Sequence, residues 1–141
     1  MIRNVHSREV PGGGVVDRVV ELWPSESWPR LRLDRPLAVG ATGGHSFVRY
    51  TCTEYLPGRR VEFTFAPGVG LVGTHVFEAV PGGIRHTVTG RAVGWMRLGW
   101  PLAVRWLHDA LIEDMFDKAA RTRRAHWSPW VRILRRVLTK G

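Results

Sequence analysis

The stretch that decides the fold is residues 71–93, LVGTHVFEAVPGGIRHTVTGRAV. Two segments rich in β-branched and aromatic residues flank Gly82-Gly83, a dipeptide that favours a two-residue hairpin turn. If these glycines form the turn, Pro81 pairs with Ile84, and one side of the hairpin is predicted to face the interior. That side carries Leu71, Gly73, His75, Phe77 and Ala79 from the first strand, and Ile84, His86, Val88 and Gly90 from the second.

A second hairpin is predicted before this one. Residues 45–56 and 60–66 are rich in β-forming side chains, and Pro57-Gly58 supplies a turn between them. In the second of these segments hydrophobic and polar residues alternate, which indicates a half-buried strand. Its inner face is expected to carry Val61, Phe63 and Phe65.

The first 44 residues carry weaker signals. Residues 1–10 predict an opening strand, and a short helix is expected at 15–23, where four valines and Trp23 are spaced for one buried face. Residues 31–39 are a candidate strand. The run at 40–44 predicts a flexible link and not a phosphate loop, because no Gly-Lys-Ser or Gly-Lys-Thr follows it.

The hydrophobic period changes after Gly94. From Leu98 to about Arg124, apolar residues recur at three- and four-residue spacing, which predicts a long amphipathic helix with a kink or a start near Pro101. Its buried side is expected to carry Val104, Leu107, His108, Leu111, Ile112, Met115, Phe116 and Ala119. Its solvated side is expected to carry Asp109, Glu113, Asp114 and Asp117.

Strands followed by one long helix indicate an α+β fold with an antiparallel sheet, because strands and helices do not alternate. One helix covers six or seven strands only if the sheet curves around it, and a cavity can remain between the two. The 141 residues, 44% hydrophobic and 23% charged, suit one folded domain. We expect this domain at residues 1–124 and a basic amphipathic extension at residues 125–141.

The net charge of +9 is concentrated after Asp117, at the end of the predicted long helix and in that extension. Eight of the 21 Lys and Arg residues follow Asp117, and no acidic residue does, so the rest of the chain is nearly neutral. Ser128-Pro129 is a good helix start. The helix that follows would present Trp127, Trp130, Val131, Leu134, Val137 and Leu138 on one face. The opposite face would carry Arg132, Arg135, Arg136 and Lys140.

Three roles fit this tail helix. Its apolar face can pack on the domain, or its tryptophans and arginines can lie at a membrane surface. Contact with a nucleic-acid backbone is the least expected role, because the domain itself is not basic. The candidate residues for membrane or partner contact are Trp127, Trp130, Arg132, Arg135 and Arg136.

The residue content argues against several other classes. Cys52 is the only cysteine, which excludes an internal disulfide and a thiolate zinc site. Arg97 and Arg105 interrupt the most hydrophobic stretch, and the first ten residues lack the apolar core of a secretion signal. We therefore expect a cytoplasmic protein, peripheral at a membrane at most, with no cofactor and no metal. No nucleophile elbow, catalytic Cys/His arrangement or paired-carboxylate motif is present.

Two histidines are predicted on the inner face of the hairpin. With Gly82-Gly83 as the turn, His75 and His86 lie about 13–14 Å apart along the ladder, too far to share one metal. Each can orient a ligand or transfer a proton near neutral pH, or be hydrogen-bonded within the sheet. His108 is expected to point into the same cavity or to be a core residue. Arg49 and Tyr50 are expected on opposite faces of one strand, and whichever of them faces inward is a candidate ligand anchor.

The order of elements resembles the START-like, SRPBCC superfamily, whose helix-grip fold is shared with the major birch pollen allergen and with polyketide cyclase/dehydrase-type proteins. The resemblance spans about residues 1–124 and is carried by fold-level patterns without a catalytic signature. The first helix looks short beside the family's usual pair, and the basic tail is extra. The carriers are Val10-Pro11, Trp23, residues 49–60, 73–78 and 85–90, and Trp100-Pro101-Leu102.

The resemblance implies a hydrophobic ligand between a curved sheet and a long C-terminal helix. We expect binding or carriage of a small lipid or polyketide-like molecule, and a pocket well below ~300 Å³ would argue against it. The alternatives are a polyketide cyclase or dehydratase that uses cavity His, Arg or Tyr side chains, and a membrane-surface module anchored by the tail. The candidate ligand contacts are Phe63, Phe65, His75, Phe77, His86, Val88, His108, Leu111 and Met115.

Overall fold

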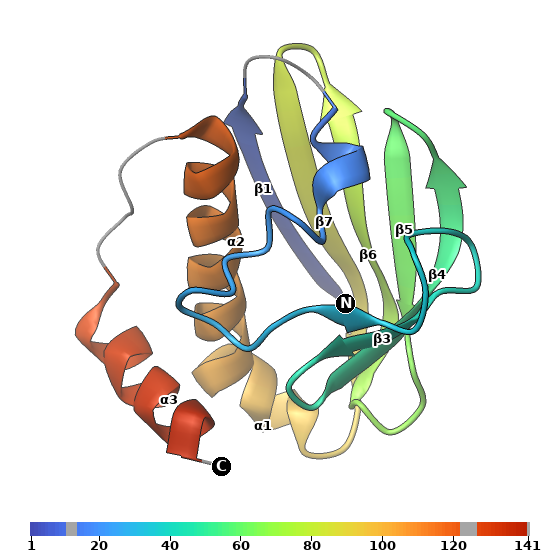
Figure 1. The fold of residues 1–141 in the computed structure, drawn as a ribbon. Helices are drawn as coiled ribbons and strands as arrows, with labels where there is room; N and C mark the ends of the chain where they lie inside the picture. Colours follow the sequence, from blue (N-terminus) through green and yellow to red (C-terminus); the bar gives the residue numbers. More distant parts are fainter. Residues whose placement is uncertain (11–13, 122–126, 141) are drawn as a thin grey trace.

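One antiparallel sheet and a long C-terminal helix make up the α+β fold of the computed structural model, which describes residues 1–10, 14–121 and 127–140, the last three by their backbone alone. Seven strands of the described chain form the curved sheet in the order β1-β7-β6-β5-β4-β3-β2 (Figure 1). This is the expected helix-grip arrangement. The strands are β1 (Ile2–Glu9), β2 (Arg32–Leu33), β3 (Thr42–His45), β4 (Val48–Leu56), β5 (Arg60–Phe65), β6 (Leu71–Val80) and β7 (Gly83–Ala92).

The β6–β7 hairpin has the predicted faces but a different register. Val80 pairs with Gly83, so the turn is Pro81-Gly82 and not Gly82-Gly83. Proline has no N–H to donate to the ladder and moves into the turn, where Gly82 adopts φ +73°. The pairing is therefore shifted by two residues, and each side chain keeps its face. Within the predicted inner set, Leu71, His75, Phe77, Ile84, His86 and Val88 are buried, whereas Ala79 is exposed.

The glycine-rich run at 40–44 is not the flexible link that we expected. Thr42–His45 forms β3, which pairs with both β2 and β4. A Cβ on Gly43 would lie 1.9 Å from the Arg32 carbonyl oxygen, and one on Gly44 equally close to that of Val48. The glycines thus serve close approach of backbones. The candidate strand at 31–39 is only β2, Arg32–Leu33.

The expected N-terminal helix is a single 3₁₀ turn, η1 (Val16–Arg18), followed by further turns. Its predicted apolar face is nevertheless buried: Val16, Val19 and Trp23 are at most 2% exposed. They pack in one core cluster with residues from β4, β5 and β6. The valine spacing identified the buried face without requiring a full helix.

The long helix runs from Met96 to Ala120 in three parts: α1 (Met96–Gly99), a π-helical segment η2 (Trp100–Val104) and α2 (Arg105–Ala120). Pro101 lies in the π-helical segment, at the irregularity predicted there. α2 ends where Arg121 adopts a left-handed conformation, φ 54°. Residues 122–124 of the predicted helix lie outside the described residues. Leu111, Ile112, Met115 and Phe116 are buried against the sheet, as expected.

The acidic side of α2 does not face solvent as predicted; most of it faces the edge strand β1. Every second residue of β1 points toward the helix, so these side chains are spaced by about 6.7 Å along the strand. Residues four positions apart in α2 lie on the same face and are spaced by about 6 Å along the helix axis. The two spacings match, so polar side chains meet in pairs. The bonds are Asn4 Nδ2 to Asp109 (2.9 Å), His6 to Asp109 (2.9 Å) and Glu113 (3.0 Å), and Arg8 to Glu113 and Asp117 (both 2.7 Å). We call these contacts the β1–α2 polar ladder.

Asp114 is the other acidic residue that is buried instead of solvated. Its Oδ2 accepts hydrogen bonds from the indole N–H groups of Trp28 (2.7 Å) and Trp127 (2.8 Å). The Arg135 guanidinium lies 3.7 Å from the centre of the Trp127 ring and donates to the Ser27 carbonyl. These contacts fix the start of the tail to the domain.

The tail helix α3 (Pro129–Lys140) begins as predicted, with the Val131 N–H donating to the Ser128 hydroxyl at 3.2 Å. It packs beside the domain (Figure 1). Val131 is buried, but Trp130 and Val137 of the predicted packing face are exposed. Arg135, expected in solvent, is half-buried. The side chain of Leu138 and the expected domain boundary at 124/125 lie outside the described residues.

Replacing Arg8 by methionine tests the polar ladder. We expect the free energy of unfolding to fall by about 2–3 kcal/mol, because Asp117, 5% exposed, loses a charged partner in a site with little water. Urea denaturation of both proteins measures the difference. Arg85→Met is the matched control: Arg85 lies on the outer face of β7, 3.6 Å from Glu78, and its loss should cost less than about 0.5 kcal/mol. Equal effects of the two variants would contradict a structural role for the ladder.

Candidate functional site

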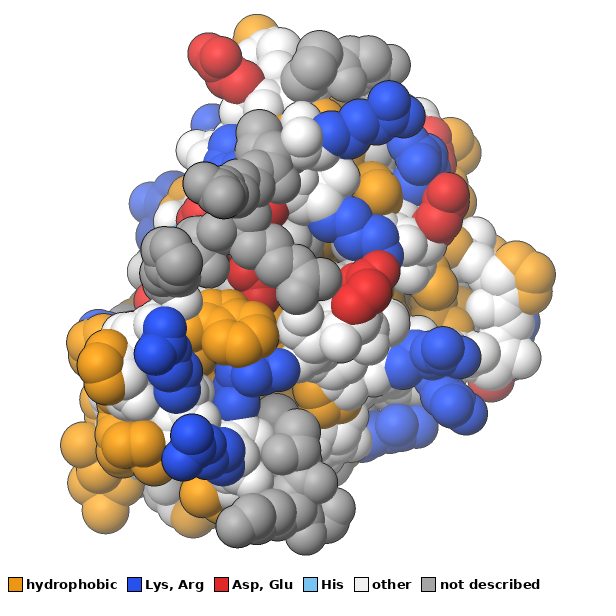
Figure 2. Space-filling view, turned by 60° about the vertical axis from the view of Figure 1, so that its left-hand side comes forward, with side chains coloured by type: hydrophobic (Ala, Val, Ile, Leu, Met, Phe, Trp, Pro, Cys, Tyr) orange, Lys and Arg blue, Asp and Glu red, His pale blue; other side chains and the backbone are white. Residues whose placement is uncertain are grey.

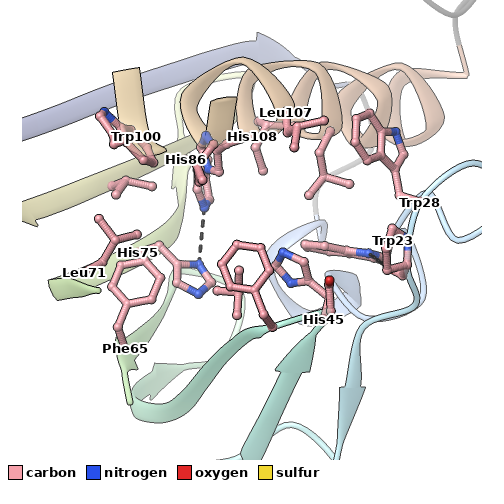
Figure 3. A pocket seen from close by; sticks show the side chains of 18 residues that line it. Trp23, Trp28, His45, Phe65, Leu71, His75, His86, Trp100, Leu107 and His108 are labelled. Carbon is pink, nitrogen blue, oxygen red and sulfur yellow. Dashed lines mark hydrogen bonds between the residues drawn. The ribbon is translucent and has the colours of Figure 1, made fainter. Parts of the chain in front are cut away.

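A pocket lies between the inner face of the sheet and the long helix (Figure 3). The strands supply its floor, η2 and α2 its roof, and the segment after η1 closes one end with two tryptophans. The lining side chains are mostly apolar, and the described ones include no Asp, Glu, Lys or Arg. The principal lining residues are Trp23, Trp28, His45, Phe65, Leu71, His75, His86, Val88, Trp100, Leu107, His108 and Leu111.

The pocket is small. Its volume is about 80 Å³, well below the ~300 Å³ at which ordinary ligand pockets begin. Ser46 and Phe47, in the turn between β3 and β4, are exposed residues of the lining and mark its mouth. In this form the pocket does not enclose a whole lipid or polyketide, and its size argues against the carriage of such a molecule that the sequence suggested.

Six of the nine predicted contact residues line the pocket: Phe65, His75, His86, Val88, His108 and Leu111. The other three, Phe63, Phe77 and Met115, are at most 1% exposed and lie in the solid core with Val16 and Val19. They share the inner face with the lining residues, but the N-terminal segment fills the space in front of them. Tyr50 is the inward member of the Arg49–Tyr50 pair and is buried, whereas Arg49 is exposed.

The sequence did not point to His45 or Trp28, and it assigned Trp23 to a buried face but not to a pocket. Trp28 lies between Pro24 and Pro29 in a segment with little regular structure, so no hydrophobic period assigned it to a face. His45 lies at the end of β3, which we expected to be a flexible link up to Gly44. Trp100, a tryptophan near the predicted helix start, is buried in the pocket wall.

Four of the described histidines line the pocket, and they follow one another across it. His45 Nδ1 lies 2.9 Å from the Tyr50 hydroxyl, and the Tyr50 ring contacts that of His75. His75 Nδ1 lies 3.4 Å from His86 Nε2 (Figure 3), which overturns the predicted separation of 13–14 Å. The cause is the shifted hairpin register, which pairs His75 with Val88 and makes His86 its diagonal neighbour. The His86 and His108 ring centres are 5.0 Å apart.

Burial keeps these imidazoles neutral. It lowers the pKa of His45 to about 3 and the pKa values of His75 and His86 well below the ordinary value, and it also lowers the pKa of His108. A neutral imidazole has one donor and one acceptor nitrogen. Within the described residues, His75 Nε2, His86 Nδ1 and both ring nitrogens of His108 have no hydrogen-bond partner. The pocket therefore offers neutral hydrogen-bonding groups in an apolar surface.

His6, on β1, has the opposite character. Its hydrogen bond with Asp109, helped by Glu113 and opposed by burial, raises its pKa above the ordinary value. Burial acts to raise the pKa of Asp109, but the neighbouring His108, His6 and Asn4 lower it overall. The helix thus separates an ionic side, toward β1, from a neutral side, toward the pocket, with His108 between them.

Comparison with known proteins supports the fold alone. No family model and no curated protein matches the sequence. The structure is similar to CalU16 from Micromonospora echinospora, with 10% identity over 98% of this chain and 83% of that chain and a TM-score of 0.59. It is similar to the protein encoded by gene BPP1335 from Bordetella parapertussis, with 15% identity over 98% of this chain and 85% of that chain and a TM-score of 0.57. It is also similar to the Aha1 dimer from Colwellia psychrerythraea, with 12% identity over 85% of this chain and 97% of that chain and a TM-score of 0.53. At these identities the chain shares a fold with these proteins, and its function has to be argued from the site itself.

Proposed function

We propose that the protein binds a small, neutral, largely apolar molecule that carries one or two hydrogen-bonding groups. The observation that carries this proposal is the composition of the pocket wall: its described residues have apolar and aromatic side chains, no charged group, and neutral histidines whose ring nitrogens lack hydrogen-bond partners among the described residues. A buried polar atom without a partner costs about 1–3 kcal/mol, which a ligand hydroxyl or carbonyl would offset. A charged ligand would find no counter-charge.

The volume limits the size of this ligand. An apolar cavity of about 150 Å³ admits one benzene ring, so a pocket of about 80 Å³ takes such a ring only if the wall yields or the ligand protrudes. The wall yields, or a ligand protrudes, most easily at the mouth, because Phe47 is exposed and Leu107 is half-buried. A one-ring phenol fits these limits better than a lipid or a polyketide.

Chemistry in the pocket, as in a cyclase or dehydratase, is the weaker alternative. A general base works best when its pKa lies near the operating pH. The pKa of His45 is about 3, and those of His75 and His86 are also far below neutrality, so each would be a weak base. These histidines suit hydrogen bonding to a bound molecule better than proton abstraction.

Filling the pocket tests the binding proposal. We expect p-cresol to quench the tryptophan fluorescence of the protein saturably, because Trp23, Trp28 and Trp100 line the pocket. Leu107→Trp puts a larger side chain into the wall and should weaken the affinity at least about tenfold, equivalent to about 1.4 kcal/mol. Calorimetric titration gives the dissociation constants.

Val72→Phe is the matched control for that variant, since Val72 is exposed on the opposite face of β6. Its affinity for p-cresol should stay within about twofold of the unaltered protein. No saturable binding of p-cresol, or an equal loss in both variants, would contradict the proposed site.

The neutral state of His45 predicts a pH dependence of stability. Its pKa in the folded protein is lowered to about 3, whereas in the unfolded chain it is about 6.5, so the unfolded state binds the extra proton between these values. The free energy of unfolding is therefore unaffected by His45 protonation above pH 6.5. As the pH falls below 6.5, proton uptake by His45 in the unfolded state lowers this free energy by at most about 1.4 kcal/mol per pH unit. Urea denaturation at pH 7 and pH 5 should show a smaller decrease for His45→Gln than for the unaltered protein. A decrease of the same size would refute a neutral His45.

Peripheral membrane binding is a second candidate, favoured by one surface. Exposed hydrophobic side chains gather on α1, η2, the start of α2 and α3, and α3 lies beside η2 because the Trp130 indole donates to the Leu102 carbonyl at 2.8 Å. Figure 2 shows hydrophobic and basic side chains interspersed on this part of the molecule. We call it the Trp–Leu surface: Trp95, Leu98, Leu102, Trp106, Trp130, Ile133 and Val137.

Its charge fits an anionic bilayer. Exposed arginines lie on the same elements, and the sequence has no acidic residue between Glu78 and Asp109 or after Asp117. Such a surface, apolar with a basic border, is typical of proteins that lie in the membrane interface. None of the described helices is long and apolar enough to cross a bilayer. The Phe47 ring at the pocket mouth contacts that of Trp95, so the mouth adjoins this surface.

Vesicle co-sedimentation tests this candidate. We expect binding to vesicles that contain phosphatidylserine, weak binding to pure phosphatidylcholine, and release by salt, because the arginine contribution is screened. The double variant Leu98→Ser, Ile133→Ser should reduce the bound fraction several-fold, whereas Val72→Ser, an exposed apolar residue on the sheet, should not. Equal binding to both lipid compositions, or no effect of the double variant, would contradict it.

A further inference from the structure

We propose that His6, His108 and Asp109 form a binding site for a divalent transition metal, with Zn²⁺ as the best fit. One ligand atom from each of the three side chains lies within 4.8 Å of the other two. The site lies where the β1–α2 polar ladder meets the pocket wall. It does not depend on the identity of the pocket ligand.

The distances are close to those of a tetrahedral site. Bonds of about 2.0–2.2 Å to imidazole nitrogen and carboxylate oxygen place neighbouring ligand atoms about 3.3–3.6 Å apart. His6 Nε2 lies 2.9 Å from Asp109 Oδ1, and His108 Nδ1 lies 3.6 Å from the same oxygen. The two imidazole nitrogens lie within 4.8 Å of each other, so they must approach by at most about 1.5 Å for one metal ion to bind all three side chains.

Two of the three proposed ligands, His6 and Asp109, also have hydrogen-bond partners that would orient them toward a metal. A metal-bound histidine usually donates its other ring N–H to a carboxylate, which fixes the tautomer and the ring orientation. His6 Nδ1 lies 3.0 Å from Glu113 Oε1, and Arg8 holds the other oxygen of that carboxylate at 2.7 Å. Asn4 Nδ2 donates to Asp109 Oδ1 at 2.9 Å and orients the carboxylate.

His108 is the residue that the ladder alone does not explain. Ion pairs of His6 with Asp109 and Glu113 need nothing from it, yet both of its ring nitrogens are buried without a hydrogen-bond partner within the described residues. A neutral imidazole with a free nitrogen next to a histidine and a carboxylate is a ready metal ligand. His6 is 16% and Asp109 36% exposed, which leaves the metal a path from solvent.

The donor set selects the class of metal. Two imidazole nitrogens and one carboxylate oxygen suit Zn²⁺ and its neighbours in the first transition row, whereas Ca²⁺ and Mg²⁺ require mainly oxygen ligands. Three protein ligands leave a fourth position for water, as in catalytic and not structural zinc sites. Because His108 also lines the pocket, the metal would lie at the pocket wall.

Metal titration of the full chain tests this proposal. After treatment with a chelator and dialysis, calorimetric titration with ZnCl₂ should show one strong site per chain, and Co²⁺ should give the visible d–d absorption of a tetrahedral complex. His6→Gln and Asp109→Asn should each weaken Zn²⁺ binding at least about 100-fold, and Glu113→Gln about 10-fold because His6 loses a hydrogen-bond partner. His45→Gln, a pocket histidine outside the cluster, should leave the affinity unchanged.

A readout on the unaltered protein keeps the test independent of variant folding. In NMR spectra of the histidine side chains, Zn²⁺ should shift the ring nitrogens of His6 and His108 and leave those of His45 in place. Absence of a stoichiometric site, equal shifts at all histidines, or an equal loss of affinity in His45→Gln would overturn the proposal.

Discussion

The polar ladder between β1 and α2 is the interaction on which the site depends. The apolar side of α2 packs on the sheet through Leu111, Ile112, Met115 and Phe116, and such contacts tolerate a shift along the helix axis. Paired charges tolerate such a shift less, because a shift by one turn would separate Arg8 from Glu113 or from Asp117. The ladder therefore specifies where along the sheet the helix sits. That position decides that His108 lies both above the pocket and beside His6.

The pocket depends on a second constraint, the curvature of the sheet. Gly73 and Gly90 face each other across β6 and β7, and a Cβ on Gly73 would lie 2.0 Å from the Thr89 carbonyl oxygen. Both have φ values near +155°, which other residues rarely adopt, so the strands can bend at this pair. A register shift between Cys52 and Glu54 in β4 adds to the irregularity of the sheet. The sheet can thus bend around α2 and leave a space that the core does not fill.

Sequence reasoning located the faces of the elements better than their pairings. Alternation with period two placed His75, His86 and Val88 inside, and these positions hold in the structure because a shift of two residues preserves the face. The same shift changed the distance between His75 and His86 completely. The turn is Pro81-Gly82 and not Gly82-Gly83 because proline lacks a backbone N–H group for the ladder, and the hydrophobic pattern does not contain this information.

The polar ladder escaped prediction for a different reason. Helical periodicity separates an apolar from a polar side, and the polar side is assigned to solvent by default. Here another polar surface faces it, the inner side of an edge strand whose residues are more than 100 positions away in the sequence. The volume of the pocket was equally inaccessible, because one of its ends is closed by Trp28, which lies in a segment without a regular hydrophobic period. Fold and faces follow from local patterns, whereas the site is made by contacts between distant segments.

The tail joins these features to the outer surface. Trp28 lines the pocket on one side and on the other shares Asp114 with Trp127, over which Arg135 lies. Removing the tail from the domain would take a donor from a buried carboxylate and uncover a wall of the pocket, which costs free energy. Membrane contact does not require the tail to leave the domain, because Trp130, Ile133 and Val137 are already exposed while α3 packs on the domain. A docked tail is therefore compatible with a protein that lies on a bilayer and keeps its pocket closed at that end.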